Sequence, residues 1–538
     1  MKFSVLNISS FRFKIKSPIG IQWVIFSLLC VGIVLLPITF LVGAFFEEVS
    51  PSWQNIRTYA LNPTIINTVI IVFMSAFFSA VVGTTLAIIM SIYNFKGRRI
   101  LHPLIILPLA IPPYISAFTY ANFLGFTGPV QSFLRNSMGI FTTFSIMNIH
   151  GAVFIFTITL YPYVYLISRS YIKNNGGALL ENARLLGRNN LYALIKIVVP
   201  LLIPSIITGT TFVALETVND FGIANYFGIR TLSTLIFQAW YFMYDINLSL
   251  RISLVLVAFI AVYLFIGKLL SKDNRYKLPQ KPITPIRLNG IGLLIIIFPV
   301  VVILISFIIP VLYMIFIMES INFNEIFVLS VNTITIASIS TFIIIFISLF
   351  VANTSRFVKT SPLFKLASIG YAIPSPVLAI GIISLFVSLD NNGLLFGHTF
   401  TFSSVMLIFA YCIKYFKSGY GNIEKGFTKV GLSYTEGSRT LGHNIIKTLF
   451  KVDVFTIKNS IISGSILIFI ELVKELPLTL ILRSFNFQSL STRVYMFAIN
   501  EQIPKSAPYS LAIILICSVF VVIISFIDEG KINGKIKN

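Results

Sequence analysis

Long apolar segments dominate this chain. Runs of 18 or more predominantly apolar residues recur along the whole 538-residue sequence, and only 11% of its residues are charged. Such runs are long enough to cross the hydrocarbon core of a bilayer as helices, and in that core only helices and closed barrels satisfy their backbone hydrogen bonds. Surface helices of a soluble protein need a polar face, which most of these segments lack. The sequence therefore predicts an all-α polytopic membrane protein.

Twelve segments are predicted to span the membrane, six in each half. In the first half they are residues 21–45, 66–93, 101–124, 148–170, 198–219 and 252–271, and in the second half 290–316, 327–352, 364–388, 403–420, 455–476 and 508–527. The first run is too long for a signal-peptide core and lacks a small-residue cleavage site. We expect five parts: a cytoplasmic N-terminus (1–20), a first half (21–271), a polar, basic linker (272–289), a second half (290–528) and a cytoplasmic C-terminus (529–538).

The positive charge of the chain follows the predicted loops. With a cytoplasmic N-terminus, alternate loops hold 32 of the 40 Lys and Arg residues, as the positive-inside rule requires. This distribution accounts for the net charge of +22 without nucleic acid, and a basic cytoplasmic face also favours anionic lipid. We therefore expect a multi-pass membrane protein with both termini in the cytoplasm.

The two halves repeat short motifs. Asn67-Thr68 recurs as Asn332-Thr333, Ala110-Ile111-Pro112 as Ala372-Ile373-Pro374, and Leu232-Ser233-Thr234 as Leu490-Ser491-Thr492, at offsets of 265, 262 and 258 residues. Because each half has an even number of spans, both copies have the same orientation, and a twofold pseudo-axis runs along the membrane normal. A transport path is expected between the halves.

Two cytoplasmic loops carry the most informative motif. In the first loop motif (residues 176–197) and the second loop motif (residues 431–452), a glutamate is followed by a small residue two positions later, an arginine, and a glycine six positions after the glutamate. The residues are Glu181, Ala183, Arg184 and Gly187 in the first, and Glu436, Ser438, Arg439 and Gly442 in the second, at an offset of 255.

The pattern predicts a short helix, a sharp turn and a longer helix that returns to the membrane. Ser433 and Glu436 have the spacing of a capping box, Gly442 permits a left-handed C-terminal turn, and Asn444 can begin the next helix. Phe455 stands where the first half has Pro200, so less kinking is expected in the second half. The plainer alternative is a pair of amphipathic loops that follow the lipid headgroups.

These loops resemble the EAA loop of binding-protein-dependent ABC importer permeases, which have the MetI-like fold. The resemblance implies that the chain lies in a bacterial inner membrane and that each loop docks on one subunit of a homodimeric ATPase at the cytoplasmic face. It also implies that ATP and Mg²⁺ bind only to that partner and that a periplasmic or extracellular protein delivers substrate. This chain is then a transport subunit rather than an enzyme and has no cofactor. It contains no Gly-x-x-x-x-Gly-Lys-Ser/Thr phosphate loop.

A second signature follows each loop motif. Carboxylates recur at the ends of two spans, and such groups usually face a cavity or pair internally. Because Glu216 and Asp220 are four residues apart, as are Glu471 and Glu475, each pair would lie on one helical face, with Lys474 as a partial counter-charge. Converging at the pseudo-axis, they would suit a hard cation or a cationic substrate. Alternatively, they pair with arginines or cap helices. The candidate path residues are Glu216, Asp220, Phe221, Gly222, Glu471, Lys474, Glu475 and Pro477.

This late segment of each half resembles ferric-iron importer permeases, and the resemblance covers nearly the whole chain. Related fused permeases for thiamine or phosphonate share the architecture, so those substrates stay open. A gradient-driven secondary transporter could also combine parallel repeats with intramembrane carboxylates, but it would not need two matched docking loops. No metal ligand is assigned, because the histidines and cysteines are scattered: His102, His150, His398, His443, Cys30, Cys412 and Cys517.

Overall fold

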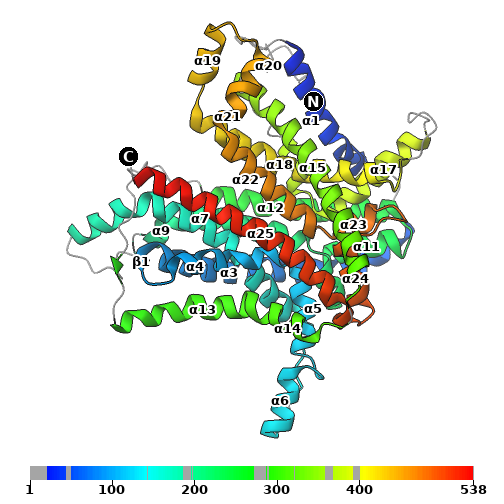
Figure 1. Ribbon diagram of the computed structural model, residues 1–538. Coiled ribbons are helices and arrows are strands. Elements are labelled where there is room, and N and C mark those ends of the chain that lie inside the picture. Colours follow the sequence, from blue (N-terminus) through cyan, green and yellow to red (C-terminus); the bar gives the residue numbers. More distant parts are fainter. Residues whose placement is uncertain are drawn as a thin grey trace, which may run out of the picture.

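The structure is a computed structural model, which describes residues 21–43, 46, 50–141, 143–185, 196, 198–271, 286–287, 290–319, 321–357, 367–391 and 400–536. The regular structure in these ranges is helical, apart from two short strands, β1 (Tyr93–Asn94) and β2 (Ile286–Arg287), which pair in parallel. The all-α fold class is confirmed (Figure 1).

The first half contains the helices that correspond to the first six predicted spans. In order they are α1 (Ile21–Gly43), α2 (Pro51–Asn55), η2 (Ile56–Ala60), α3 (Leu61–Ile92), α4 (Arg98–Ile106), η3 (Leu107–Ala110), α5 (Pro113–Phe123), α6 (Pro129–Met138), α7 (Ile149–Leu185), α9 (Val199–Asn219), α10 (Gly222–Tyr226), α11 (Leu232–Tyr241) and α12 (Ile246–Leu270).

The second half repeats this order with different breaks. Its elements are η5 (Gly290–Ile296), α13 (Ile297–Ile303), η6 (Leu304–Ile308), α14 (Ile309–Ile317), α15 (Phe323–Phe357), η7 (Ala367–Ala372), α17 (Ser375–Asn391), α18 (Ser404–Val430), α19 (Ser433–Thr440), α20 (Ile445–Thr448), η8 (Leu449–Asp453), α21 (Val454–Thr456), α22 (Lys458–Lys474), α23 (Pro477–Leu482), α24 (Leu490–Ile499) and α25 (Ile503–Ile536).

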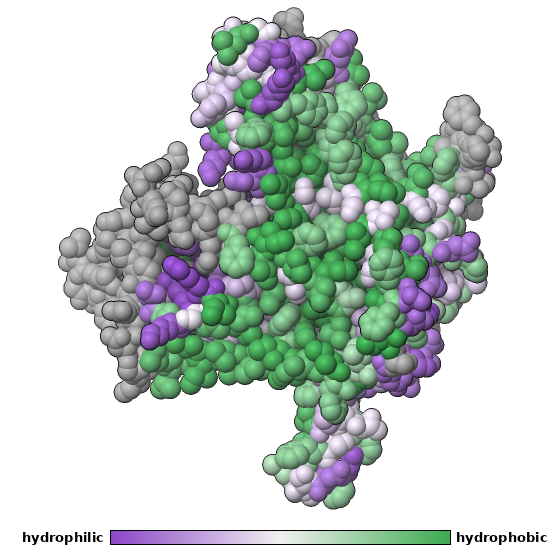
Figure 2. All heavy atoms as spheres, in the orientation of Figure 1, coloured by the Kyte–Doolittle hydropathy of each residue, from purple (hydrophilic) through white to green (hydrophobic). Residues whose placement is uncertain are grey.

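Each of the twelve predicted spans coincides with a helix or a broken helix. Seven described helices are long and apolar enough to cross a membrane alone, and two strongly bent helix pairs raise that number to nine. Shorter apolar helices occupy the first and ninth predicted spans, and the lysine-bearing α18 occupies the tenth. Figure 2 shows broad apolar surface over these helices, with hydrophilic patches towards the ends of the molecule, as expected for a protein surrounded by lipid.

The repeated Ala-Ile-Pro motif breaks a helix in each half. In the first half, the helices on either side of Ile111 and Pro112 are bent by 91°. Ile111 has extended backbone angles, because a residue before proline is pushed out of the helical region. In the second half, η7 ends at Ala372 and α17 begins at Ser375. Each half therefore turns at its own copy of the motif.

The other two repeated motifs contact each other in the same way in both halves. The hydroxyl of Thr68 accepts the backbone N–H of Leu232 at 3.0 Å, and Thr333 accepts that of Leu490 at the same distance. This equivalence indicates that the halves are two copies of one fold.

The halves exchange their first helices. Helix α1 of the first half packs against α15 and α17 of the second, while α13 and α14 of the second half pack against α4 and α5 of the first (Figure 1). Side chains pair across these contacts: Ser27 donates to Thr354 at 2.9 Å, and Tyr313 donates to Asn122 at 2.5 Å. The exchanged helices therefore add a second set of contacts between the two halves.

Candidate functional site

A small polar pocket lies where the two halves meet. All four predicted carboxylates line it, together with Gly222, Lys474 and Pro477. The other predicted path residue, Phe221, is 1% exposed and instead packs against Phe237, with ring centroids 4.4 Å apart. The sequence thus predicted the convergence of the acidic residues correctly, although no group of three or more His, Cys, Asp or Glu among the described residues could hold a metal ion.

Two of the four carboxylates cap short helices. An Asp220 oxygen accepts the N–H of Ile223 at 2.8 Å, and a Glu475 oxygen accepts the N–H of Leu478 at 3.1 Å. Each accepted N–H belongs to the second residue of α10 or α23, so the pair repeats at the 255-residue offset. The expectation that each pair of acids shares a helical face was wrong, because α9 ends at Asn219 and α22 at Lys474. The helix-cap alternative is correct for these two residues.

The remaining two glutamates are held by tyrosines of the opposite half. Tyr163 donates to Glu471 at 3.0 Å, and Tyr371 donates to Glu216 at 3.3 Å. Glu471 also forms an ion pair with Lys474 at 3.0 Å. Glu216 contacts the neutral hydroxyl of Tyr371, whereas the other three carboxylates contact a backbone N–H or an ammonium group. Glu216 therefore differs from the other three in the chemistry of its partner.

Lys414, which is 2% exposed, lies near the pocket although its role was not evident from the sequence. Its ammonium group donates to the side-chain oxygen of Asn219 at 2.8 Å and to the carbonyl of Ile373 at 2.7 Å. The Ser375 N–H also donates to Asn219, at 3.2 Å. Lys414 thus links α18 to the end of α9 in the other half. Its position within a predicted span was the available signal, since charged residues there usually face a protein interior.

Tyr114 is a further lining residue that the sequence did not reveal. It is 3% exposed, and its hydroxyl is buried with no hydrogen-bond partner in the described part of the chain. A Cβ atom on Gly222 would lie 2.7 Å from the Tyr114 Cβ and 3.2 Å from a Leu476 methyl. Gly222 therefore permits the close approach of α10 to both residues at the junction of the halves.

A second, wider cavity adjoins the acidic pocket and shares Glu471 and Lys474 with it. Its α18 residues include Lys417 and Lys425, which lie further along the helix towards the second loop motif. His102 also lines this cavity and is hydrogen-bonded to Tyr165 and Arg169, at 2.8 and 2.9 Å. The acidic pocket thus lies next to a larger, basic cavity on the side of the second loop motif.

The second loop motif forms the predicted helix, turn and helix. Helix α19 is followed by Gly442 at φ +82°, and the side chain of Asn444 caps α20 by accepting the Lys447 N–H at 2.8 Å. Gly442 and Asn444 are therefore confirmed in their predicted conformational roles. The capping box was wrong: Leu432 precedes α19 and makes no side-chain cap, and Ser433 is already the first helical residue.

The motif exposes a mixed polar and apolar surface. Glu436 is exposed, as are the large apolar side chains Tyr434, Leu441, Ile446 and Phe450. Ser438 is buried and contacts His443 and Thr448, both at 3.1 Å, so it supports the turn, while Arg439 is half-buried. An exposed apolar patch away from the spans suits a protein contact.

The return to the membrane bends sharply without a proline. The helical segment Ile445–Thr456 and α22 meet at 78°. The expectation of less kinking at Phe455 was therefore wrong, because the chain bends at Ile457 after the π-helical turn η8 instead.

The first loop motif is described only in part. Helix α7 continues without interruption to Leu185, so Glu181, Ala183 and Arg184 lie in its last turn and not in a separate short helix. Gly187 lies outside the described residues.

The chain matches one protein family twice, over residues 83–276 and 344–530. That family is described as the binding-protein-dependent transport system inner membrane component. The chain belongs to this family. This permease is also similar to the Fe(3+)-transport system permease protein FbpB 2 of Haemophilus influenzae, with 22% identity over 80% of this chain and 83% of that protein.

Other relatives match one half. The spermidine/putrescine transport system permease protein PotB of Haemophilus influenzae is 28% identical over 48% of this chain and 95% of its own length. The sulfate transport system permease protein CysT of Salmonella typhimurium is 28% identical over 35% of this chain and 68% of its own. The permease is therefore a fused, two-half membrane subunit of an ABC importer, and this membership decides against a gradient-driven carrier.

Proposed function

We propose that this permease carries ferric iron into the cytoplasm, using ATP that a separate homodimeric ATPase hydrolyses. The observation that carries the proposal is the convergence of four carboxylates from both halves on one pocket. Carboxylate oxygens suit hard cations. One relative, which aligns with 80% of this chain, is named as a Fe(3+)-transport permease, which supports the same substrate.

The pocket would act as a passage and not as a storage site. Two acids are engaged in capping and one is paired with Lys474, which leaves little free negative charge and favours weak binding. Weak binding suits transport, because a substrate that enters the path must also leave it. Iron then moves from the pocket into the wider cavity on the cytoplasmic side.

The loop motifs would couple this passage to ATP. Each would dock on one ATPase subunit through its glutamate and the neighbouring apolar residues, with both chain termini in the cytoplasm of a bacterial cell. Closure of the ATPase dimer draws the loops together and opens the pocket outward to a substrate-loaded binding protein. Hydrolysis returns the permease to the inward-open state.

A polyamine is the second candidate substrate. The acidic pocket also suits an organic cation, and PotB, which is named for spermidine and putrescine, aligns over nearly its full length. Ferric iron is preferred because the FbpB 2 alignment extends through both halves.

Uptake of radiolabelled substrate by cells that lack this chain, before and after its return, tests the assignment. Ferric iron, spermidine and thiamine are compared, with the partner ATPase and binding protein present. We expect the returned chain to restore iron uptake alone. Restoration of spermidine or thiamine uptake without iron would reject ferric iron.

A further inference from the structure

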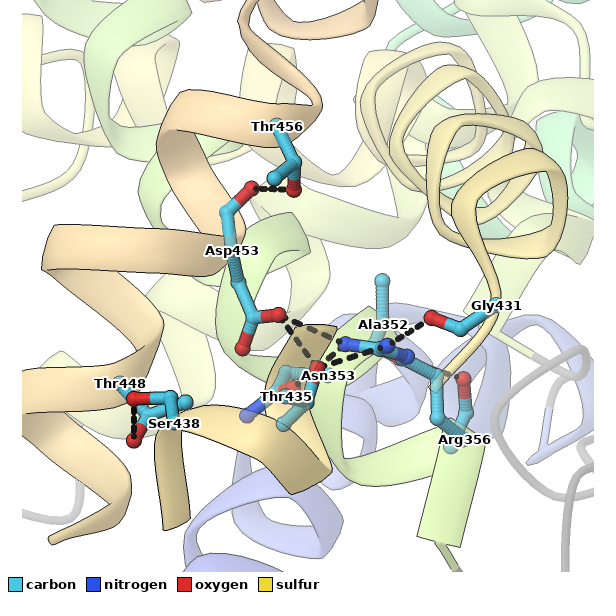
Figure 3. Close-up of polar contacts among 10 residues, drawn as sticks. Ala352, Asn353, Arg356, Gly431, Thr435, Ser438, Thr448, Asp453 and Thr456 are labelled. Carbon is cyan, nitrogen blue, oxygen red and sulfur yellow. Dashed lines mark hydrogen bonds and ion pairs between the residues drawn. The ribbon is translucent and has the colours of Figure 1, made fainter. Parts of the chain in front are cut away.

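A buried polar network lies at the base of the second loop motif (Figure 3). Arg356, in the last turn of α15, contacts three other elements. One guanidinium nitrogen lies 3.4 Å from an Asp453 oxygen, and another donates to the Gly431 carbonyl at 2.6 Å and to the Thr435 hydroxyl at 3.1 Å. Thr435 in turn donates to Asp453 at 2.6 Å. We call Arg356, Asp453 and Thr435 the loop clamp.

The loop clamp is shielded from water. The side chains of Arg356 and Asp453 are 10% and 4% exposed, and the guanidinium group lies 4.2 Å from the centroid of the Phe427 ring. Buried charges interact strongly and are costly to leave unpaired. The clamp therefore holds α15, the end of α18, α19 and η8 in one arrangement.

The position of the loop clamp explains how the second half bends without a proline. Asp453 is the last residue of the π-helical turn η8, a type of turn that is often found at functional sites. Four residues later the chain bends by 78° at Ile457 and enters α22. In the first half, the residues at the offset of 255 from Thr435 and Asp453 are Leu180 and Val198, and Pro200 follows. The first half therefore lacks, in sequence, the counterparts of Thr435 and Asp453.

Helix α22 connects the bend at Ile457 to the pocket. It begins at Lys458, directly after the bend, and ends at Lys474, so its last turn carries Glu471 and Lys474. A movement of α19 is transmitted to the pocket through α22 only if the bend at Ile457 is rigid.

We propose that Arg356 and Asp453 are positioning residues for energy coupling, which fix α19 against α22 so that movement of the docked loop is passed to the acidic pocket. This role rests on the proposed docking of the ATPase on the loop motifs, but it does not depend on which substrate is carried. Under this proposal, coupling through the second half depends on an ion pair for which the first half has no counterpart in sequence.

The test uses the complete transporter with its ATPase and binding protein in proteoliposomes. Arg356→Met, Asp453→Asn and the milder Thr435→Ala are compared with Lys451→Met, which removes an exposed cation from the same π-helical turn. We expect assembled Arg356→Met and Asp453→Asn complexes to retain ATP hydrolysis but to transport at least tenfold less substrate for each ATP. Thr435→Ala should show a smaller loss, and Lys451→Met should match the parent.

A distance measurement separates this proposal from the choice of substrate. Nitroxide labels replace the exposed residues Phe265 on α12 and Ile462 on α22, and their separation is measured with and without ATP. The parent should show an ATP-dependent change that Arg356→Met greatly reduces, even if iron is not the substrate. If assembled Arg356→Met and Thr435→Ala complexes keep both the parental distance change and the parental transport per ATP, the clamp has no coupling role.

Discussion

The phenol of Tyr163 in the first half donates a hydrogen bond to Glu471 in the second half at 3.0 Å. The reverse contact, from Tyr371 of the second half to Glu216 of the first, is 3.3 Å long. Each glutamate is therefore oriented by the opposite half. A rocking motion that separates the halves would break both contacts and change the environment of both carboxylates together.

Tyr163→Phe should weaken this link. Hydrogen bonds to charged groups contribute about 1.5–3 kcal/mol, so we expect a several-fold loss of substrate uptake at equal membrane abundance. Tyr59→Phe, at a 77% exposed tyrosine, is the control and should match the parent. Parental uptake by Tyr163→Phe would mean that Glu471 does not need this orientation.

Glu216→Gln and Asp220→Asn should behave differently, although both remove one acid from the pocket. Asn caps helices about as well as Asp, so Asp220→Asn keeps the contact with Ile223 and should lose little uptake. Glu216→Gln removes the carboxylate that contacts the neutral hydroxyl of Tyr371, and uptake of a cation should fall at least tenfold. Equal losses in the two variants would show that only the total charge of the pocket matters.

Lys414→Met should destabilise the contact between the halves. The substitution removes the ammonium group that donates to the Ile373 carbonyl and to Asn219, and it leaves Asn219 with the Ser375 N–H as donor. An unsatisfied buried polar group costs about 1–3 kcal/mol, so the thermal unfolding midpoint of the purified permease should fall. Lys429→Met, at an exposed position on the same helix, should leave the midpoint unchanged. An unchanged midpoint in Lys414→Met would contradict the assigned link.

Gly442→Val should uncouple the permease without removing it from the membrane. Because Gly442 has φ +82°, a β-branched residue there costs about 1–2 kcal/mol or distorts the turn. Transport and co-purification of the ATPase should both fall. Gly437→Ala, at a helical glycine with open space around its Cβ position, is the control. Undiminished co-purification and transport in Gly442→Val would reject the turn as part of the docking surface.

The sequence predicted the features that depend on local pattern and on the repeat. The positions of the spans follow from hydropathy, the left-handed turn at Gly442 follows from its residue type, and the convergence of Glu216 with Glu471 follows from the repeated offset. These features need no knowledge of which residues meet across the fold.

Features that depend on where a helix ends, or on distant pairing, were not predicted. The capping-box prediction was wrong because α19 begins one residue earlier than the motif required. The prediction that Asp220 shares a helical face with Glu216 was wrong because α9 ends just before Asp220. Arg356 and Asp453 are 97 residues apart, and only the packing of α15 against the loop brings them together.

ATP-dependent uptake of radiolabelled ferric iron into proteoliposomes tests the central claim most directly. The complete transporter is reconstituted with the parent chain or with the double variant Glu181→Ala/Glu436→Ala, in matched amounts and with loaded binding protein outside. We predict that the parent takes up iron only with ATP and that the double variant loses this uptake. Equal uptake by both, or uptake without ATP, would contradict an iron permease driven through its two loop motifs.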